Sequence, residues 1–568
     1  MNHTADMRQL GRDSSCLMSR CGPRPIVRIT YLTTLVIAAA TSVVLLGCDS
    51  DITGAALENE PPDTQLSVRD TSLVENLGGD DRLSSTVFVT WSGTDRDGFV
   101  PRFQIRFYQR TERPGPEERW SETTRNDSLV LLPIPRGERI ADVVFEARAV
   151  DNQGIKDPTP ARTVFPIKNS PPAVRLSIFD LPPDTTFQIF SFAWAATDPE
   201  GEENLDRIEV SLNDTLNFVP LPADVTFATF VGQLDANQPN QGVAEARVFT
   251  GRGFAGTDIR VPNLLLDAEN TFYIRAVDRT DTTSTMDVFT WYVKGQKSDV
   301  LYVNDYRIST NTILLEFHSQ LLSDYLPLNA SFDVWDITRP FVSGNVGNVP
   351  RSSSLPPAAD PTLRRMLAQW KHIYWVSTNT INSTAGNNLP YVADVMDLFF
   401  ENGGTLMVHS PISLPNDPEE NLGNAALLLL PLTGLITFPD SLRPSLRINT
   451  GAEVDPTEPV PGLQQQLPPL VARGFQLNTL PYFAQGANTI PLYSAEYQYV
   501  TREGNRRGPW PGPSTVASMS ADRRIGLFAM PLIDSQNGQL SWAGQDGDPD
   551  AARRAVMMML ESLGFPKR

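Results

Sequence analysis

Phe145-Glu146-Ala147-Arg148-Ala149-Val150-Asp151 and Phe272-Tyr273-Ile274-Arg275-Ala276-Val277-Asp278 are two copies of one pattern, an apolar run with an internal arginine and a closing aspartate. Two further blocks recur upstream in the same order. They are Asn59-Glu60-Pro61-Pro62 with Asn169-Ser170-Pro171-Pro172, and Trp91-Ser92-Gly93-Thr94-Asp95 with Trp194-Ala195-Ala196-Thr197-Asp198. Three matched blocks in one order are typical of an internal duplication, so the sequence predicts two copies of one domain.

Each copy has the pattern of a β-sandwich. In the first copy, short runs of β-branched and aromatic residues are separated by turn formers. These runs are residues 87–91, 103–108, 129–134 and 143–150. We place module 1 at residues 61–168 and module 2 at 169–296, and we expect the repeated Trp and Phe to pack between two sheets. An insertion in module 2, roughly 225–258, is rich in Gly, Asn and Gln and is expected to form a long loop.

The early Trp strand and the late Phe-x-x-Arg-Ala-Val-Asp strand resemble those of fibronectin type III or related immunoglobulin-like modules. The resemblance covers about residues 57–296. It implies a tandem of β-sandwich modules, and it implies nothing about function.

The pattern changes at Asp299, where buried-strand runs begin to alternate with helical ones. Strands are predicted at 299–305, 373–377, 405–410 and 524–530, and helices at 314–325, 391–402 and 551–563. This alternation predicts an α/β domain over 299–568 with a mainly parallel, flavodoxin-like sheet. The loop-rich segment 440–515 is expected either to cover this sheet or to form an appended β excursion.

Asn402-Gly403-Gly404-Thr405-Leu406-Met407-Val408-His409-Ser410 resembles the helix, double glycine and strand of the class I glutamine-amidotransferase-like fold, particularly ThuA-like proteins. The resemblance implies a reactive residue at the end of this strand. The cysteine of amidotransferases is absent, which excludes glutaminase chemistry. His409, Ser410 and Asp305 remain as catalytic candidates, and Asp305 and His409 as ligand-binding ones.

Two features argue against a nucleophilic Ser410. The surrounding residues lack the Gly-x-Ser-x-Gly pattern of a nucleophile elbow. The following Pro411 has no N–H group to donate to an oxyanion. We therefore favour a polar strand end without catalysis, with a ligand pocket as one alternative. A hydrolase or carbohydrate-modifying enzyme that uses this strand-end cleft is the other.

The N-terminal region has the pattern of a bacterial lipoprotein signal. Arg20, Arg24 and Arg28 precede an apolar run over 29–46, and Leu45-Leu46-Gly47-Cys48 ends it. We expect residues 1–47 to be removed, Cys48 to carry acyl chains, and 48–60 to form a tether. Because the run is near the lower length limit of a membrane span, an uncleaved transmembrane anchor is the alternative. The expected location is the cell envelope, facing the periplasm or the cell surface.

Composition limits the remaining functions. A net charge of −19 opposes binding to nucleic acids. Only three cysteines occur, Cys16, Cys21 and Cys48, so the mature chain lacks thiols for catalysis, zinc or iron–sulfur ligation. We expect no cofactor. The alternative is that calcium binds to the acidic turns that contain Asp95, Asp97, Asp198 and Glu200.

In a third acidic segment, residues 546–550, we expect Asp550 to cap the following helix. Together these observations predict a lipid-anchored cell-envelope protein with a binding or scaffolding role and a catalytically degenerate head domain. Its partners would be membrane lipid, through Cys48, and a glycan, a peptide or another envelope protein.

Overall fold

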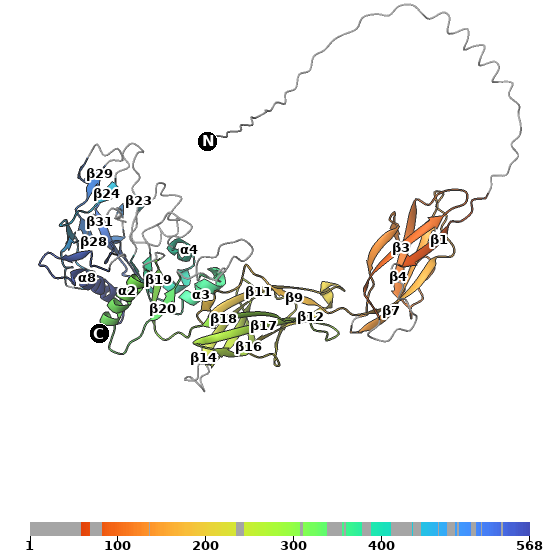
Figure 1. Ribbon diagram of the computed structural model, residues 1–568, viewed down its shortest axis with the longest axis horizontal. Coiled ribbons are helices and arrows are strands. Elements are labelled where there is room, and N and C mark those ends of the chain that lie inside the picture. The colour runs from red at the N-terminus through yellow and green to blue at the C-terminus, as the bar shows by residue number, and fades with distance from the viewer. Residues whose placement is uncertain are drawn as a thin grey trace, which may run out of the picture.

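The computed structural model describes residues 58–68, 82–135, 137–234, 243–306, 311–337, 355–356, 359–377, 388–409, 434–435, 445–463, 465–473, 483–484, 488–500, 507–512, 514–534 and 538–568. Two sandwich modules and a C-terminal domain follow one another in space as they do in sequence, and module 2 lies in the middle (Figure 1). Cys48, Ser410 and the alternative membrane anchor over 29–46 lie outside the described residues.

Module 1 consists of two sheets that enclose one core. The smaller sheet has the order β1-β3-β6, with bounds Asp63–Val68, Thr86–Thr94 and Asp127–Leu131. The larger has the order β2-β8-β7-β4-β5, with bounds Leu83–Ser84, Ala161–Lys168, Ile140–Val150, Arg102–Gln109 and Ser121–Thr123. Trp91 and Phe145 meet between the sheets with ring centroids 5.9 Å apart, which confirms their predicted core role.

Module 2 repeats this plan with two five-stranded sheets. One has the order β16-β15-β14-β11-β9, with bounds Ala255–Leu265, Val243–Thr250, Phe227–Leu234, Ile189–Thr197 and Ala173–Leu176. The other has the order β10-β18-β17-β12-β13, with bounds Thr185–Thr186, Asp287–Val293, Ala268–Asp278, Leu205–Leu212 and Val219–Pro222. A short 3₁₀ helix, η2, covers Glu202–Asn204. Trp194 and Phe272 are both buried in the core between the sheets.

The predicted long loop over 225–258 is wrong. Strands β14 and β15 occupy most of this segment, and they pair antiparallel from Ala228–Thr250 to Leu234–Ala244. Phe230, Ala246 and Val248 are fully buried in the core, and in β15 the half-buried Glu245 and Arg247 alternate with the buried residues. The Gly, Asn and Gln content obscured this alternation of period two in the sequence.

The C-terminal domain is built on a mixed sheet of ten strands. Its parallel half has the order β20-β19-β21-β22-β32, with bounds Asp333–Asp336, Val300–Asp305, His372–Ser377, Thr405–His409 and Ile525–Phe528. Its antiparallel half continues as β31-β28-β25-β26-β33, with bounds Thr515–Ser520, Thr489–Ala495, Glu453–Pro456, Leu470–Ala472 and Trp542–Gly544.

The expectation of a mainly parallel sheet therefore holds for one half only. The segment 440–515 supplies β25, β26 and β28, so it extends the sheet instead of covering it. Short strands form two further small sheets. They are β23 and β27, Gly434–Leu435 and Phe483–Ala484, and β24, β29 and β30, Ser445–Arg447, Gln498–Val500 and Arg507–Pro509.

Helices cover both faces of the parallel half. On one face, α2 (Asn311–Tyr325) and α8 (Ala551–Ser562) bury apolar side chains in the same cluster as Tyr302 and Met407. The other face carries η3, α3, α4 and α5, with bounds Ala359–Leu363, Arg364–Leu367, Leu389–Ala393 and Asp397–Glu401. None of the helices within the described residues is long and apolar enough to cross a membrane.

In this domain one local prediction is wrong and another holds only in part. The single helix expected over 391–402 is divided into α4 and α5, because a tight turn with a Val395 N–H to Val392 O bond of 3.0 Å interrupts it. Asp550 holds the N-cap position of α8, but its side chain makes no capping hydrogen bond. Its backbone N–H instead donates to Asp548 Oδ1 at 3.0 Å, and its carboxylate lies 3.7 Å from Arg553.

Candidate functional sites

The two strand-end candidates, Asp305 and His409, lie on opposite faces of the parallel sheet. The register pairs Asn304 with Val376 and Val376 with His409, so His409 shares the face that α2 covers. Asp305 is one residue further along its strand and therefore points to the other face. The two side chains do not form one site, which is a correction to the predicted strand-end pocket.

His409 is enclosed in a buried aromatic cluster. Its ring centroid lies 4.8 Å from that of His318 on α2 and 5.7 Å from that of Phe528. Burial disfavours the imidazolium form and lowers the pKa of His409 to about 3. His318 is also fully buried, and its Nδ1 forms a 2.7 Å hydrogen bond with the Tyr374 hydroxyl. Both histidines are therefore neutral packing residues at ordinary pH.

Asp305 has a structural role in positioning α4. Its two carboxylate oxygens accept hydrogen bonds from the Asn388 backbone N–H at 2.7 Å and from the Asn388 side-chain amide at 2.6 Å. Asn388 is the N-cap residue of α4, so the buried Asp305 fixes the start of that helix. No acid–base pair forms at the strand ends within the described residues, and Ser410 lies outside them.

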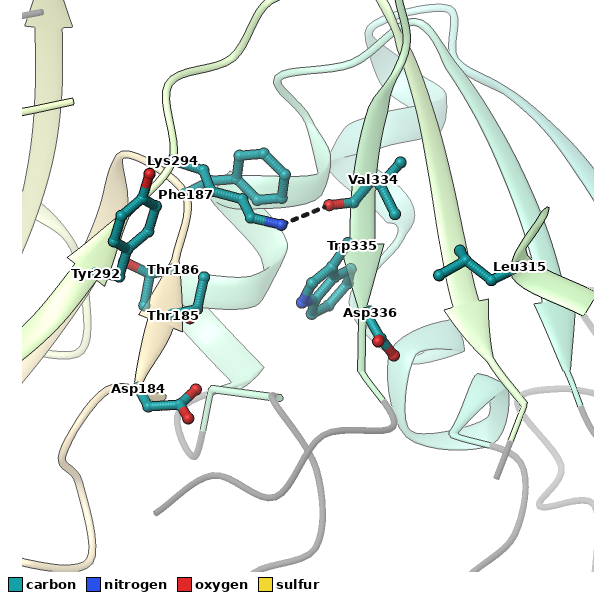
Figure 2. Close-up of a pocket in the computed structure, with 10 residues that line it drawn as sticks. All are labelled: Asp184, Thr185, Thr186, Phe187, Tyr292, Lys294, Leu315, Val334, Trp335 and Asp336. Carbon is teal, nitrogen blue, oxygen red and sulfur yellow. Dashed lines mark hydrogen bonds between the residues drawn. The ribbon is translucent and has the colours of Figure 1, made fainter. Parts of the chain in front are cut away.

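A cavity of about 410 Å³ lies at the seam between module 2 and the C-terminal domain (Figure 2). The module contributes a rim of residues from β10, β18 and their flanks, and the domain contributes one wall from β20 and α2. The lining comprises Asp184, Thr185, Thr186, Phe187, Tyr292, Lys294, Leu315, Val334, Trp335 and Asp336. The Lys294 ammonium crosses the seam and donates to the Val334 carbonyl at 3.0 Å.

Sequence reasoning missed this cavity. Its residues come from four separated segments, and none of these segments carries a recognisable motif. A mostly apolar cavity with a few convergent polar groups at a domain interface is the usual form of a small-ligand site. Here Asp184 and Asp336 supply carboxylates, while Tyr292 and Trp335 supply aromatic surface.

The seam itself is a packed interface. Phe187 of module 2 meets Trp370 of the C-terminal domain edge-to-face, with ring centroids 4.7 Å apart. Ser191 and Thr362 join the two domains through a 2.5 Å hydrogen bond between buried hydroxyls. Ile189 and Phe187 belong to the same buried cluster as Leu367 and Trp370. Module 2 and the C-terminal domain therefore share a core.

The repeated motifs meet at one end of each module. In module 1, the Asn59 side-chain amide donates to Asp151 Oδ2 at 2.5 Å. In module 2, Asn169 makes the same bond to Asp278 at 2.5 Å. This hydrogen bond from the Asn-x-Pro-Pro block to the closing aspartate therefore connects the segment that enters each module to a late strand of that module.

The calcium candidates differ between the two module ends. Asp97 is exposed and accepts the Glu60 backbone N–H at 3.1 Å, and Asp95 Oδ1 accepts from the Asp97 N–H at 3.4 Å. Asp198 and Glu200 are buried where module 1 contacts module 2. Among the described residues, no group of three or more His, Cys, Asp or Glu side chains is arranged to hold a metal ion.

Burial raises the pKa of Asp198 to about 7, and the neighbouring carboxylates of Glu200 and Asp278 add to the effect. Glu200 Oε1 accepts hydrogen bonds from Ser85 Oγ of module 1 at 2.5 Å and from the Ser170 N–H at 3.0 Å. This joint between the modules is therefore polar and buries two acidic side chains.

Comparisons with known proteins concern the fold. No protein-family model and no curated protein matches the chain. Among solved structures, it is similar to the fibronectin(III)-like modules of Clostridium thermocellum CbhA, at 12% identity, 41% of this chain, 95% of that chain and a TM-score of 0.15. It is also similar to the chicken CNTN1 FN1–FN3 domains. The identity is 13%, the match covers 42% of this chain and 68% of that chain, and the TM-score is 0.19. A third similar structure is the chicken interferon gamma receptor alpha chain. The identity is 11%, the match covers 41% of this chain and 98% of that chain, and the TM-score is 0.19.

At such TM-scores these similarities carry no argument, and the assignment of both sandwiches depends on the strand pairing described above.

Proposed function

We propose that the chain is a lipid-anchored cell-envelope protein that binds an envelope ligand in the seam cavity, with the two sandwich modules acting as spacers. The cavity between module 2 and the C-terminal domain is the observation that carries this proposal. It combines about 410 Å³ of space with aromatic surface and two carboxylates, and its residues Phe187 and Trp335 belong to the packed interface. The anchor would be Cys48, through the lipoprotein signal that precedes it.

The lining favours a ligand with a cationic group. Asp184 and Asp336 are acidic, and Tyr292 and Trp335 offer ring surfaces to which a cation is attracted. Lys294, the cationic residue of the lining, donates to the Val334 carbonyl at 3.0 Å. Among a glycan, a peptide and another envelope protein, a peptide segment with a Lys or Arg side chain fits this chemistry best.

The C-terminal domain enters the proposal as a degenerate relative of the amidotransferase-like fold. The sequence Asn402–Ser410 and the parallel half of the sheet support that relationship. A hydrolase or carbohydrate-modifying activity gains no support, because Asp305 and His409 face opposite sides of the sheet and each is engaged in packing or in fixing a helix.

Anchoring is tested by the mass and the membrane fractionation of the mature protein, wild type against Cys48→Ala. We expect an acyl adduct and membrane association in the wild type, both lost in the variant. A wild-type chain that is unmodified and soluble would contradict the proposed anchor. One that keeps residues 1–47 would favour the transmembrane alternative.

Ligand binding is tested with a tetralysine peptide, titrated calorimetrically into the full-length chain and into the double variant Asp184→Asn, Asp336→Asn. The expected result is binding that the double variant weakens at least tenfold. Asp258→Asn is the matched control, because Asp258 is an exposed carboxylate on β16 outside the cavity lining. Equal loss in the control would indicate non-specific attraction to an acidic chain, and absence of binding would contradict the cationic ligand.

A further inference from the structure

Two exposed apolar side chains lie in neighbouring loops of module 1. Phe99, between β3 and β4, is 65% exposed, and Ile155, between β7 and β8, is 40% exposed. Two hydrogen bonds join these loops, because the Asn152 N–H donates to the Phe99 carbonyl and the Phe99 N–H to Asn152 Oδ1, both at 3.1 Å. We call residues 95–100 and 151–156 the tip of module 1.

The tip also holds the chain that enters module 1. The Asn59 amide nitrogen donates to Asp151 Oδ2 at 2.5 Å, and its oxygen accepts from Gln153 at 2.7 Å. The Glu60 N–H donates to Asp97 Oδ2 at 3.1 Å. The two tip loops and the entering segment therefore form one hydrogen-bonded end of the module.

This end lies away from module 2. Ser85, just before β3, bonds to Glu200 of module 2, and the nine residues of β3 then lead to Thr94, next to the tip. A strand of that length spans about 30 Å. Figure 1 shows module 1 at one end of the row of three units, with module 2 on one side only. Module 2 therefore leaves the tip uncovered.

The tip is close to the proposed lipid anchor along the chain. Residues 49–57 separate Cys48 from Glu58, where the described chain starts. A polypeptide extends by at most about 3.6 Å per residue, so Glu58 stays within about 36 Å of Cys48. Since Asn59 is bonded to the tip, a bilayer that holds Cys48 lies within reach of it. This step rests on the proposed function, because it requires acylation of Cys48.

Module 2 provides an internal comparison for the two apolar positions. Ile155 and Thr282 are counterparts, since the N–H of each donates to the aspartate that closes the preceding strand, at 2.8 Å and 2.9 Å. Counted from the repeated Trp, Phe99 corresponds to the exposed Glu202. The end of module 2 faces module 1 and carries Glu and Thr. The end that faces the anchor carries Phe and Ile.

Scattered exposed apolar residues are common on protein surfaces and require no partner. Phe99 and Ile155 differ from these by their place, because they share the one module end from which the chain continues to the anchor. We propose that this tip inserts into the surface of the bilayer that holds Cys48. Apolar side chains at the boundary between headgroups and acyl chains are removed from water, which stabilises such a contact.

Tip insertion would orient the protein on the membrane. The tether alone leaves module 1 free to turn, whereas a tip that contacts the bilayer adds a second point of attachment. Because module 2 is joined to the opposite end of module 1, this orientation holds module 2 and the seam cavity away from the bilayer surface.

The charges near the tip indicate which lipid surface it contacts. Glu58, Glu60 and Asp97 are exposed, and the Arg96 guanidinium lies 3.7 Å from Glu60. Anionic lipids attract basic segments, and they repel carboxylates. We therefore expect contact with a zwitterionic phospholipid surface.

The test uses the acylated full-length mature chain in vesicles of phosphatidylethanolamine and phosphatidylcholine, with and without quencher groups on the acyl chains. An environment-sensitive fluorophore is attached at Arg96→Cys, because the Arg96 side chain is 88% exposed within the tip. Acylation of Cys48 and removal of residues 1–47 leave no other thiol. We expect the quencher lipids to lower the emission roughly twofold or more. This quenching should be lost when Phe99→Ser and Ile155→Ser are added.

Leu216→Cys provides the matched control position. Leu216 is 87% exposed and lies in module 2 between β12 and β13, so its label should stay in water in both backgrounds. The serine variant should keep the wild-type thermal transition, because both replaced side chains are exposed. The mass of each sample reports whether Cys48 is acylated.

The outcomes separate the tip from the anchor. An unmodified Cys48 would contradict the proposed function, and tip insertion with it. An acylated chain whose Arg96→Cys label is quenched no more than the Leu216→Cys label would overturn tip insertion and leave the anchor intact. Equal quenching with and without Phe99 and Ile155 would also overturn it, since the tether alone would then explain the proximity. A signal that rises with protein density in the vesicles would assign the tip to contact with a second copy, which overturns it as well.

Discussion

The two joints of this protein differ in kind. Between module 2 and the C-terminal domain, Phe187 and Ile189 share a buried cluster with Trp370, and buried hydroxyls cross the interface. Between module 1 and module 2, two side-chain hydrogen bonds cross the joint, from Ser85 Oγ to Glu200 Oε1 and from Arg139 Nε to the Thr280 carbonyl at 3.4 Å. The first joint is stabilised by removing apolar surface from water, which no change of ions or pH reverses easily. The second depends on the charge state of buried carboxylates.

This difference teaches how one chain can contain both a rigid and an adjustable connection. An apolar interface fixes one arrangement, because every side chain fills space left by another. A polar joint that buries carboxylates is less stable when these groups lose their protons, because burial disfavours the charged form. We therefore expect module 2 and the C-terminal domain to move as one body, and module 1 to respond to solution conditions.

The largest expected effect is at the apolar joint. Phe187→Ala removes a fully enclosed ring that packs on Trp370, and should lower the free energy of unfolding by about 3–5 kcal/mol. Urea-induced unfolding followed by tryptophan fluorescence measures this change. The control is Phe179→Ala, since Phe179 is 56% exposed and its removal should change stability by less than about 0.5 kcal/mol. Similar losses in both variants would contradict a shared core.

The hydroxyl pair at the same joint should have a smaller effect. Ser191→Ala leaves buried Thr362 and Thr229 each without one hydrogen-bond partner, and should cost about 1–3 kcal/mol. The same unfolding measurement checks it, and limited proteolysis shows whether the two domains separate first. If Ser191→Ala is neutral, the apolar contacts alone determine this joint.

The polar joint should be distinguished by its pH dependence in chelator. The raised pKa of Asp198, about 7 against 3.8, means that the folded chain keeps a proton that the unfolded chain releases. Stability from this group is therefore lost as the pH rises from about 4 to about 7, and the full penalty remains above 7.

Asp198→Asn should accordingly raise stability at pH 8 by about 1–2 kcal/mol and flatten the profile between pH 4 and pH 7. Thermal unfolding over this pH range, in chelator, measures both quantities. Asp258→Asn serves as the exposed control. An unchanged dependence of stability on pH in Asp198→Asn would show that this carboxylate does not determine the stability of the joint.

The smallest effect is expected at the contact between module 1 and Glu200. Ser85→Ala removes one of two donors to Glu200 Oε1, and the Ser170 N–H remains, so the cost should be about 1 kcal/mol or less. Its clearer consequence is a broader scattering distribution of the full-length chain. Ser84→Ala is the control, because the hydroxyl of the exposed Ser84 donates to the carbonyl of nearby Thr86, within the same module. Equal behaviour of both variants would show that Ser85 does not hold the modules together.

Much of the fold could be predicted from the sequence because it depends on local patterns. The repeated Trp and Phe positions gave the two sandwich cores, and the runs at 299–305, 373–377 and 405–409 gave three parallel strands. The prediction failed at 225–258, where the content of Gly, Asn and Gln obscured the alternation of buried and exposed residues that is typical of strands. It also failed at 391–402, where one apolar periodicity fits a continuous helix and two short ones equally well.

The candidate sites were much less predictable. Asp305 and His409 both end strands, and only the register between β19, β21 and β22 shows that they face opposite sides. The seam cavity combines segments separated by up to about 150 residues, for which the sequence carries no common signal. Of the four acidic candidates, burial distinguishes Asp198 and Glu200 from Asp95 and Asp97, and Glu200 also accepts a hydrogen bond from Ser85 of the neighbouring module.

The sequence by itself determined the duplication, the alternation of most strands and the change to helices and buried strands at Asp299. These features follow from side-chain period and turn chemistry, which act over a few residues. Only the tertiary structure decided the faces of the strand ends, the seam cavity and the contrast between the two joints. The reason is that burial and electrostatic compensation are properties of surfaces in contact, and those surfaces are formed by residues that the chain order keeps far apart.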